Sequence, residues 1–314
     1  MAVKAVIDIG SNSIKMRIAN VINSQVKVIR DETDVVKLGR GMSNTGYLNE
    51  QSMKNSCDTV TRMVKRAMKY KAEIFIVGTM ALRTAKNSHT FINMIKNSTG
   101  YDVNVFSGED EAKYSWYGAI DGFDIDGKVL MFDSGGGSTE FVLGINGQIE
   151  KIVSVPVGAV TLLEKFFYDS NKPVKAKFCD EIVNYVKNLL LEYNIIDFIS
   201  SKDEKLKIIG VGGGAVSMAG VKNACENFEP SKLHGEILTV RDVERQIKMY
   251  SSLTLKEREN IIGLPPARAD AILGSACIIL TVLKFFAVNS FRVSINGLRH
   301  GLLIYNENEK KFER

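Results

Sequence analysis

The pattern of apolar and polar positions along the chain predicts alternating strands and helices. Apolar runs with a period of two, and short unbroken apolar runs bounded by turn residues, indicate strands. They occur at residues 2–9, 14–21, 25–31, 74–79, 102–106, 129–133, 139–145, 148–156, 207–211 and 291–295. Apolar residues at helical spacing predict helices at 49–70, 174–192, 240–251, 255–259, 269–287 and 298–309. This mixed order of strands and helices places the chain in the α/β class.

The strands fall into two similar series, which indicates an internal duplication. The segment VIDIGSNSIKMRI (6–18) aligns with MFDSGGGSTEFVL (131–143). Further along, and in the same order, IVGTMA (76–81) aligns with GVGGGA (210–215). We therefore expect each half of the chain to follow one plan, a strand–loop–strand unit followed by a strand and a helix.

The length of the chain agrees with this division, because 314 residues exceed what one hydrophobic core usually supports. The segment DGFDIDG (121–127) is rich in turn-forming residues and marks the expected boundary. We predict an N-terminal domain of residues 1–123 and a C-terminal domain of residues 124–314.

Composition narrows the class of protein further. A hydrophobic content of 45% with 25% charged residues describes a folded globular chain. The longest apolar stretch (271–283) falls short of the roughly 20 residues that span a bilayer, and the N-terminus has no signal-peptide core. Four scattered cysteines favour a reducing, cytoplasmic location. A net charge of +5 mildly favours an anionic partner but does not predict nucleic-acid binding.

Two matched glycine-rich turns are candidates for phosphate binding. DIGSNS (8–13) and DSGGGS (133–138) share the pattern Asp-x-Gly-x-x-Ser after a strand. The backbone N–H groups of such turns, with Asn12, Ser13 and Ser138 as side-chain donors, suit phosphate oxygens. The strand-end aspartates suit a divalent cation between carboxylate and phosphate, since Mg²⁺ prefers oxygen ligands. A hairpin capped by Asx hydrogen bonds gives the same pattern, but its repetition favours function.

Two further features point to an anion. The cluster VGGGA (211–215) follows a strand and precedes a helix, and helix N-termini attract anions. A strand-to-helix turn that needs close packing would show the same glycines. Arg83 follows the strand at 74–79 and is placed to reach an anion at its end. Its alternative role is a solvated charge on a helix face.

The sequence SGEDE (107–111) contains the candidate catalytic carboxylate. Ser107 and Asp110 fit a capping box, and Glu109 complements the helix dipole. Glu111 is less easily explained by capping and lies shortly before Asp133, so it is the candidate general base for activating water. Three acids at the start of a helix are the simpler explanation from the pattern alone.

Taken together, these motifs resemble the exopolyphosphatase/guanosine pentaphosphate phosphohydrolase (Ppx/GppA) family. The resemblance covers nearly the whole chain. It rests on DIGSNSIK (8–15), GTMALRTAKN (78–87), SGEDEAKYSWYGA (107–119), FDSGGGSTEF (132–141), GVGGG (210–214), LHGEILT (233–239), GLPPARADAILGSA (263–276) and INGLRHGLL (295–303).

The resemblance implies a fold and a chemistry. The fold is α/β, with duplicated actin-like (ribonuclease H-like) ATPase-superfold domains, an interdomain cleft, and a last helix (about 298–314) that packs back on the first domain. The implied cofactor is Mg²⁺ or Mn²⁺. The implied partner is inorganic polyphosphate or guanosine pentaphosphate, without nucleic acid or membrane, and a homodimer is compatible with it.

The resemblance also assigns roles to individual residues. Glu111 matches the catalytic base. The metal site matches Asp133, Gly135 and Glu140, and the phosphate contacts match Asn12, Ser13, Arg83, Gly136, Gly137, Ser138, Gly213 and Arg268. Two positions depart from the family pattern: Asp110 replaces the usual Glu beside the base, and His300 replaces the usual Glu of Gly-Leu-Arg-Glu-Gly, which puts any role of that acid in doubt.

These expectations lead to an exopolyphosphatase, in which Glu111 activates a water that attacks the terminal phosphoryl group. The alternative within the family is a guanosine pentaphosphate 5′-phosphatase. A kinase that uses ATP would need an adenine site and an acceptor pocket, and the sequence has no distinct signature of either. A sensor that binds polyphosphate or a nucleotide without turnover would have no need for Glu111.

Overall fold

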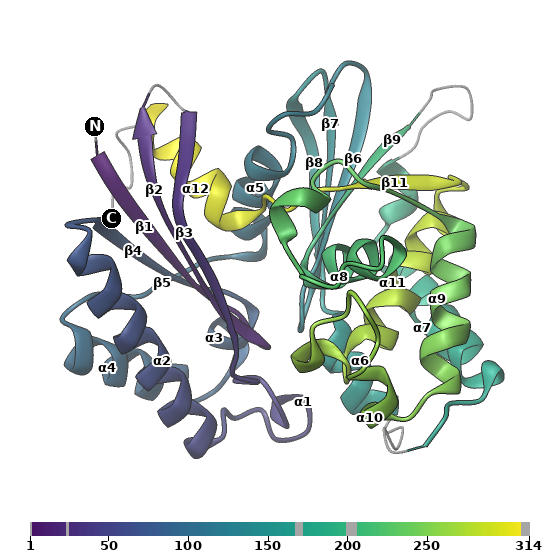
Figure 1. The fold of residues 1–314 in the computed structure, drawn as a ribbon, viewed down its shortest axis with the longest axis horizontal. Helices are drawn as coiled ribbons and strands as arrows, with labels where there is room; N and C mark the ends of the chain where they lie inside the picture. Colours follow the sequence, from purple (N-terminus) through teal and green to yellow (C-terminus); the bar gives the residue numbers. More distant parts are fainter. Residues whose placement is uncertain (1, 23–24, 167–171, 199–205, 309–314) are drawn as a thin grey trace. The chain divides into compact units, whose positions relative to one another are not determined.

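The computed structural model describes residues 2–22, 25–166, 172–198 and 206–308 (Figure 1). Its internal contacts divide the chain into two compact units. The first comprises Met1–Gly118 and Asn296–Arg314, and the second comprises Ala119–Ile295. The chain therefore crosses between the units twice, and the first crossing lies slightly before the position 123/124 expected from the turn-rich segment.

The first unit is built, in its described residues, on a five-stranded sheet with the order β3-β2-β1-β4-β5. β2 is antiparallel to β1 and β3, whereas β4 is parallel to β1 and β5. The strands are β1 (Ala2–Ile9), β2 (Ser13–Ile22), β3 (Gln25–Val35), β4 (Glu73–Gly78) and β5 (Asn104–Val105). The helices are α1 (Met42–Thr45), α2 (Glu50–Lys69), α3 (Met80–Thr84), α4 (Ser88–Thr99), α5 (Gly108–Ala119) and α12 (Leu298–Asn308).

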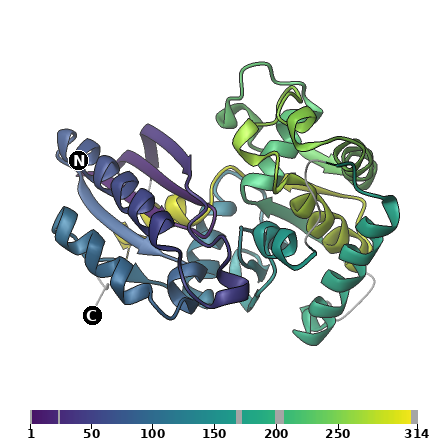
Figure 2. The same cartoon turned by 90° about the horizontal axis from the view of Figure 1, so that it is seen from below.

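Side chains of β1 alternate between two apolar clusters, one on each face of this sheet. Ala5, Ile7 and Ile9 are fully buried in a cluster that includes the apolar face of α2. Val6 lies in the other cluster, together with Leu302 of α12. Helices α2 and α12 therefore cover opposite faces of the first sheet (Figures 1 and 2).

The second unit contains, in its described residues, a six-stranded sheet with the order β10-β11-β9-β6-β7-β8. The strands are β6 (Lys128–Ser134), β7 (Thr139–Ile145), β8 (Gln148–Val155), β9 (Lys207–Val211), β10 (Ile237–Thr239) and β11 (Ser290–Val293). The α-helices are α6 (Ala159–Phe166), α7 (Ala176–Glu192), α8 (Gly213–Lys222), α9 (Val240–Ser252), α10 (Leu255–Arg258) and α11 (Ile272–Phe285). Short 3₁₀ turns are η1 (Ile195–Phe198), η2 (Pro230–Leu233) and η3 (Pro266–Arg268).

Helix α11 forms the centre of the second core. Its residues 272–283 are all buried, and it packs against α6, α7, α8 and α9. This explains why its sequence is apolar on every side rather than amphipathic. Neither α11 nor any other helix in the described part of the chain is long and apolar enough to cross a membrane.

The two sheets share one plan, which confirms the predicted duplication. In each, three consecutive antiparallel strands are followed by a strand (β4 or β9) that runs parallel beside the first. The two hairpin turns close with the same hydrogen bond, since the N–H groups of Gly10 and Gly135 donate to the carbonyl oxygens of Ser13 and Ser138, both at 3.0 Å. The α/β class with duplicated domains is confirmed, and the interdomain cleft stays a prediction.

Two strand predictions are wrong in length. β3 continues past residue 31 to Val35, because it pairs with β2 as far as the register Ser13↔Val35. Polar side chains are tolerated there because β3 is an edge strand. The strand predicted at 102–106 shrinks to Asn104–Val105, which is exposed at the other edge of the sheet.

Candidate active site

The turn between β1 and β2 is the first of the predicted phosphate-binding turns, and its backbone is held by the segment that follows β3. The carbonyl oxygen of Asn12 accepts hydrogen bonds from the N–H groups of Val36 (3.1 Å) and Lys37 (2.9 Å). Asn12 and Ser13 are buried. The Ser13 hydroxyl is buried and has no hydrogen-bond partner among the described residues, so it retains an unused donor at this turn.

Arg83 and Glu111 are brought together in the first unit, although they belong to different helices. The Nη1 group of Arg83, on α3, donates to the Phe106 carbonyl oxygen (2.8 Å) and to Oε2 of Glu111 (3.2 Å). The two side chains are 24% and 14% exposed, so the pair is partly shielded from water but not sealed. The Phe106 contact anchors the guanidinium, and the guanidinium in turn orients the carboxylate.

The acid next to Glu111 has a structural role, as predicted. The N–H group of Asp110 donates to Ser107 Oγ (3.0 Å), while Ser107 donates from its hydroxyl (2.6 Å) and its backbone N–H (3.3 Å) to Asp110 Oδ2. This is a complete capping box at the start of α5. Of the three acids in the first turn, Glu109 and Asp110 are exposed and only Glu111 points into the body of the unit, against Arg83.

In the second unit, two carboxylates face each other across the hairpin of β6 and β7. Asp133 and Glu140 are directly opposed in the antiparallel register, so their side chains lie on one face of the sheet. Glu140 is 2% exposed and accepts a hydrogen bond from Ser154 Oγ (2.8 Å). Ser154 is a residue that the sequence reasoning missed. Its signal is the pairing of β7 with β8, which sets Glu140 opposite Ser154.

The donor atoms at this hairpin fit a divalent cation. Among the described residues, no group of three or more His, Cys, Asp and Glu side chains is placed to hold a metal ion. Asp133, Glu140 and the carbonyl groups of the turn nevertheless supply oxygen ligands only. Mg²⁺ and Mn²⁺ suit oxygen ligands, and Mg²⁺ is commonly held by one or two carboxylates plus waters and phosphate oxygens. The residues fit the predicted metal, and the metal itself stays a prediction.

The glycine-rich turn of the second hairpin is fixed by close packing on the start of α6. The carbonyl oxygens of Gly135 and Gly136 accept hydrogen bonds from the N–H groups of Ala159 (3.1 Å) and Val160 (2.8 Å). A Cβ atom at Gly158 would lie 2.4 Å from the Gly136 carbonyl carbon, so only glycine allows this approach. The turn is therefore preorganised, as a phosphate-binding loop must be.

The third glycine cluster reaches the same end of β6. Gly212 has φ of 106°, and a Cβ atom there would lie 2.3 Å from the Ser134 carbonyl oxygen and 3.4 Å from Asp133 Oδ1. A Cβ atom at Gly213 would lie 2.1 Å from Nη1 of Arg268. The Arg268 guanidinium therefore lies over the first residue of α8, where helix N–H groups also favour an anion. Asp133, Gly213 and Arg268 thus converge within the second unit.

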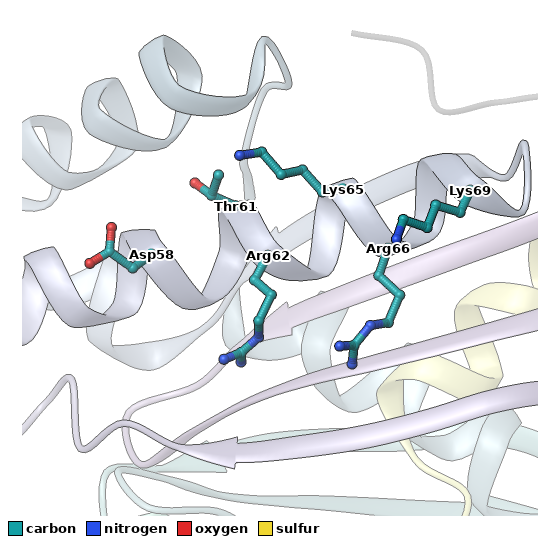
Figure 3. A pocket seen from close by; sticks show the side chains of 6 residues that line it. All are labelled: Asp58, Thr61, Arg62, Lys65, Arg66 and Lys69. Atoms are coloured by element: carbon teal, nitrogen blue, oxygen red, sulfur yellow. The ribbon is translucent and has the colours of Figure 1, made fainter.

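A separate basic surface lies on α2, a helix that carries none of the predicted site residues. A hollow of about 400 Å³ is lined by Asp58, Thr61, Arg62, Lys65, Arg66 and Lys69 (Figure 3). Arg62 and Arg66 form ion pairs with Asp34 and Glu32 of β3. Much of its positive charge is therefore neutralised locally, and we assign it no role in binding the substrate.

Comparison with known proteins places this geometry in context. The bifunctional 3-dehydroquinate synthase/phosphatase of Fusobacterium nucleatum subsp. nucleatum is 31% identical over 318 residues, which cover 96% of this chain and 46% of that protein. The guanosine-5'-triphosphate,3'-diphosphate pyrophosphatase of Photobacterium profundum is 27% identical over 300 residues, which cover 95% of this chain and 58% of that protein. The chain thus spans about half the length of these relatives.

A solved structure agrees over nearly the full length of both chains. The crystal structure of an exopolyphosphatase from Cytophaga hutchinsonii has a TM-score of 0.86 and 27% sequence identity, and the match covers 97% of each chain. The sequence model of the Ppx/GppA phosphatase family matches residues 17–310, which include Arg83, Glu111 and the whole second hairpin. The resemblance inferred from the motifs is confirmed, and the chain belongs to the Ppx/GppA phosphatase family.

Proposed function

We propose that this chain is an exopolyphosphatase, which releases terminal orthophosphate from inorganic polyphosphate by attack of an activated water. Its family supports a phosphohydrolase, and the C. hutchinsonii structure supports this substrate. The observation that carries the proposal is the repeated turn, closed by the same 3.0 Å hydrogen bond in both units. Two such turns suit a substrate made only of linked phosphoryl groups, because each can bind phosphate oxygens.

Glu111 is the proposed general base. Its contact with Arg83 and its place in the first turn of α5 hold the carboxylate in one orientation. At 14% exposure, the side chain is accessible to a water molecule. In the proposed reaction, Glu111 takes the proton of the water as the oxygen attacks phosphorus in line with the departing polyphosphate.

The second unit is proposed to bind the phosphoryl group and to stabilise the charge that develops on it. The hydrogen-bond donors to the phosphoryl oxygens would be backbone N–H groups and one guanidinium. They are the N–H groups of the turn at Gly136 and Gly137, those at the start of α8 at Gly213, and the side chain of Arg268. Asp133 and Glu140 would hold Mg²⁺ or Mn²⁺, which when bound polarises phosphoryl oxygens and offsets their negative charge.

A second candidate is a guanosine pentaphosphate 5′-phosphatase, and the relative from P. profundum favours it. The two reactions use the same phosphoryl chemistry and differ in what binds the rest of the substrate.

Release of orthophosphate, measured with malachite green, distinguishes these candidates. The chain should be given long-chain polyphosphate, guanosine pentaphosphate and ATP in parallel, each with Mg²⁺ and with Mn²⁺. We expect the highest kcat/KM for polyphosphate. Release from guanosine pentaphosphate alone would replace the proposal with the second candidate, and binding of polyphosphate without any release would indicate a sensor.

A further inference from the structure

A buried arginine with a dense set of partners lies at the centre of the first unit, on the face of the sheet that α12 covers. Arg17 of β2 is only 4% exposed. Its Nε and Nη2 groups donate to Oδ2 of Asp31 on β3 (2.8 and 2.5 Å), and Nη1 donates to Oδ1 of Asn296 (2.8 Å). Asp31 also pairs with Arg299 of α12. The proposed chemistry uses none of these residues.

The remaining partner of Arg17 is His300, one of the two residues that depart from the family pattern. Nη1 of Arg17 lies 3.1 Å from Nδ1 of His300, whose side chain is buried. A guanidinium has donors only, so Nδ1 must be the acceptor and carry no proton. The His300 ring is therefore neutral in this arrangement, with its proton on Nε2. A second proton would remove the acceptor and place two cations 3.1 Å apart in a buried site.

The helix that His300 anchors is in backbone contact with α5. A Cβ atom at Gly301 would lie 1.8 Å from the Tyr114 carbonyl oxygen, and one at Gly118 would lie 2.3 Å from the Gly297 carbonyl oxygen. The Tyr305 ring of α12 also packs on α5, stacked on Tyr117 with 4.8 Å between ring centroids and edge-on to Tyr114 with 5.4 Å between them. With no side chain between them at the glycines, the two helices fix each other's position.

Helix α5 carries Glu111 in its first turn, one turn before Tyr114. The carboxylate therefore depends on α5 for its position, and α5 depends on α12. We propose that His300 is a positioning residue for Glu111: its neutral ring holds α12 on Arg17, α12 holds α5, and protonation of His300 loosens both helices. This inference rests on the proposed role of Glu111 as the base.

The other charged groups near His300 do not titrate in the same range. Burial alone would raise the pKa of Asp31, but Arg299 and Arg17 outweigh it and the pKa is lowered, so Asp31 remains ionised from pH 5.5 to 8. Arg17 and Arg299 remain cationic. Lys4, on the same face of β1 as Val6, and Lys113, over the Tyr305 ring, are cations as well. A histidine ring that has been released to solvent ordinarily takes up a proton below about pH 6.5, so acidification through this range should favour release of His300 from Arg17, and substitution of His300 tests that assignment.

Hydrogen exchange tests, without any substrate, whether the contact of His300 with Arg17 holds α12 and α5 in place. Exchange of the α5 and α12 amides should be compared at pH 5.5 and 7.5, corrected for the intrinsic effect of pH. In the wild-type chain we expect the amides of both helices to exchange about tenfold faster at pH 5.5 than at pH 7.5, and those of α2 to be unaffected. The factor follows because the open state, with His300 released, gains one proton, and pH 5.5 lies about one unit below the ordinary pKa of a histidine. Equal protection of α5 and α12 at the two pH values would overturn the proposal.

Two variants assign the effect to His300. His300→Asn places an acceptor oxygen near the position of Nδ1, and His300→Glu supplies a carboxylate that pairs with Arg17; neither titrates near pH 6.5. Both should abolish the pH-dependence of exchange. If either variant is poorly folded, the other and the wild-type chain still decide the question. An unchanged pH-dependence in a folded variant would exclude His300 as its source.

The pH-dependence of turnover tests whether the contact of His300 with Arg17 affects the proposed base, Glu111. With whichever substrate is hydrolysed, we expect the ratio of kcat at pH 7.5 to kcat at pH 5.5 to be about tenfold larger in the wild-type chain than in His300→Glu, with KM similar in both. If the wild-type chain and His300→Glu had the same ratio of kcat values while hydrogen exchange still depended on pH, the proposed effect of His300 on Glu111 would be contradicted. Absence of phosphate release at every pH would contradict the proposed function, and the exchange result would still stand on its own.

Discussion

At the scale of single residues, Glu111 separates an enzyme from a protein that only binds phosphate. Glu111→Gln keeps the size of the side chain and its contact with Arg83, but it removes the proton acceptor. We expect turnover of polyphosphate to fall by about 10²–10⁴-fold, the usual contribution of a positioned general base. Affinity for polyphosphate should be kept or improved, because one negative charge leaves an anion site. Single-turnover phosphate release and equilibrium binding measure the two effects separately.

Asp110→Asn is the matched control, one residue away on the same helix. Because Asp110 completes the capping box of α5, its loss should lower the free energy of unfolding by about 1 kcal/mol and leave the rate nearly unchanged. The opposite result, with activity lost in Asp110→Asn and kept in Glu111→Gln, would move the base to Asp110.

The duplication supplies a comparison for the metal site. Asp133 and Asp8 are equivalent, but Asp133 faces Glu140 across its hairpin, whereas Asp8 faces Lys15 with its Nζ at 3.9 Å. We expect Asp133→Asn to raise the Mg²⁺ concentration needed for half-maximal activity and to slow turnover. Asp8→Asn should shift the Mg²⁺ requirement less, since a lysine already offsets its charge. Full activity of the parent chain in excess chelator would exclude a metal at this pair.

At the scale of elements, the contact between α12 and α5 should be intolerant of any side chain. Gly301→Ala would place Cβ 1.8 Å from the Tyr114 carbonyl oxygen, so we expect a loss of about 1–3 kcal/mol or more in the free energy of unfolding, by urea titration. Gly100→Ala is the control, because it has open space and only a positive φ of 79°. It should cost about 1 kcal/mol. Equal costs would show that α12 can move away from α5.

The elements that the sequence predicted are those with a strong local signal. α2 was predictable because its buried residues form one stripe and Asn49 caps its start. α4 and α6 were not predicted. α4 buries only Phe91 and Ile95 in its length, and α6 has eight residues, too few for a clear period. Their place in the fold depends on tertiary packing, which no short window of sequence contains.

At the scale of the whole molecule, the difference between local sequence signals and long-range contacts explains how much of the candidate site was predictable. The phosphate-binding turns were found because their residues are consecutive and repeat. The contacts of Glu111 with Arg83 and of Arg17 with His300 join residues far apart in the chain, so no local pattern indicates them. Composition contributed little to finding the candidate site, since the site is made of backbone groups and ordinary carboxylates.

The division of the chain into two units leads to a prediction about substrate binding. Glu111 belongs to the first unit and Asp133 to the second, and the chain crosses between them at 118/119 and 295/296. A substrate that requires both residues must draw the units into one closed arrangement. For Glu111→Gln with Mg²⁺ and long-chain polyphosphate, we expect small-angle scattering to give a smaller radius of gyration than for the free protein. Orthophosphate, which fills at most one half of the site, should leave the radius unchanged. Identical profiles with and without polyphosphate would argue that the two units do not bind it together.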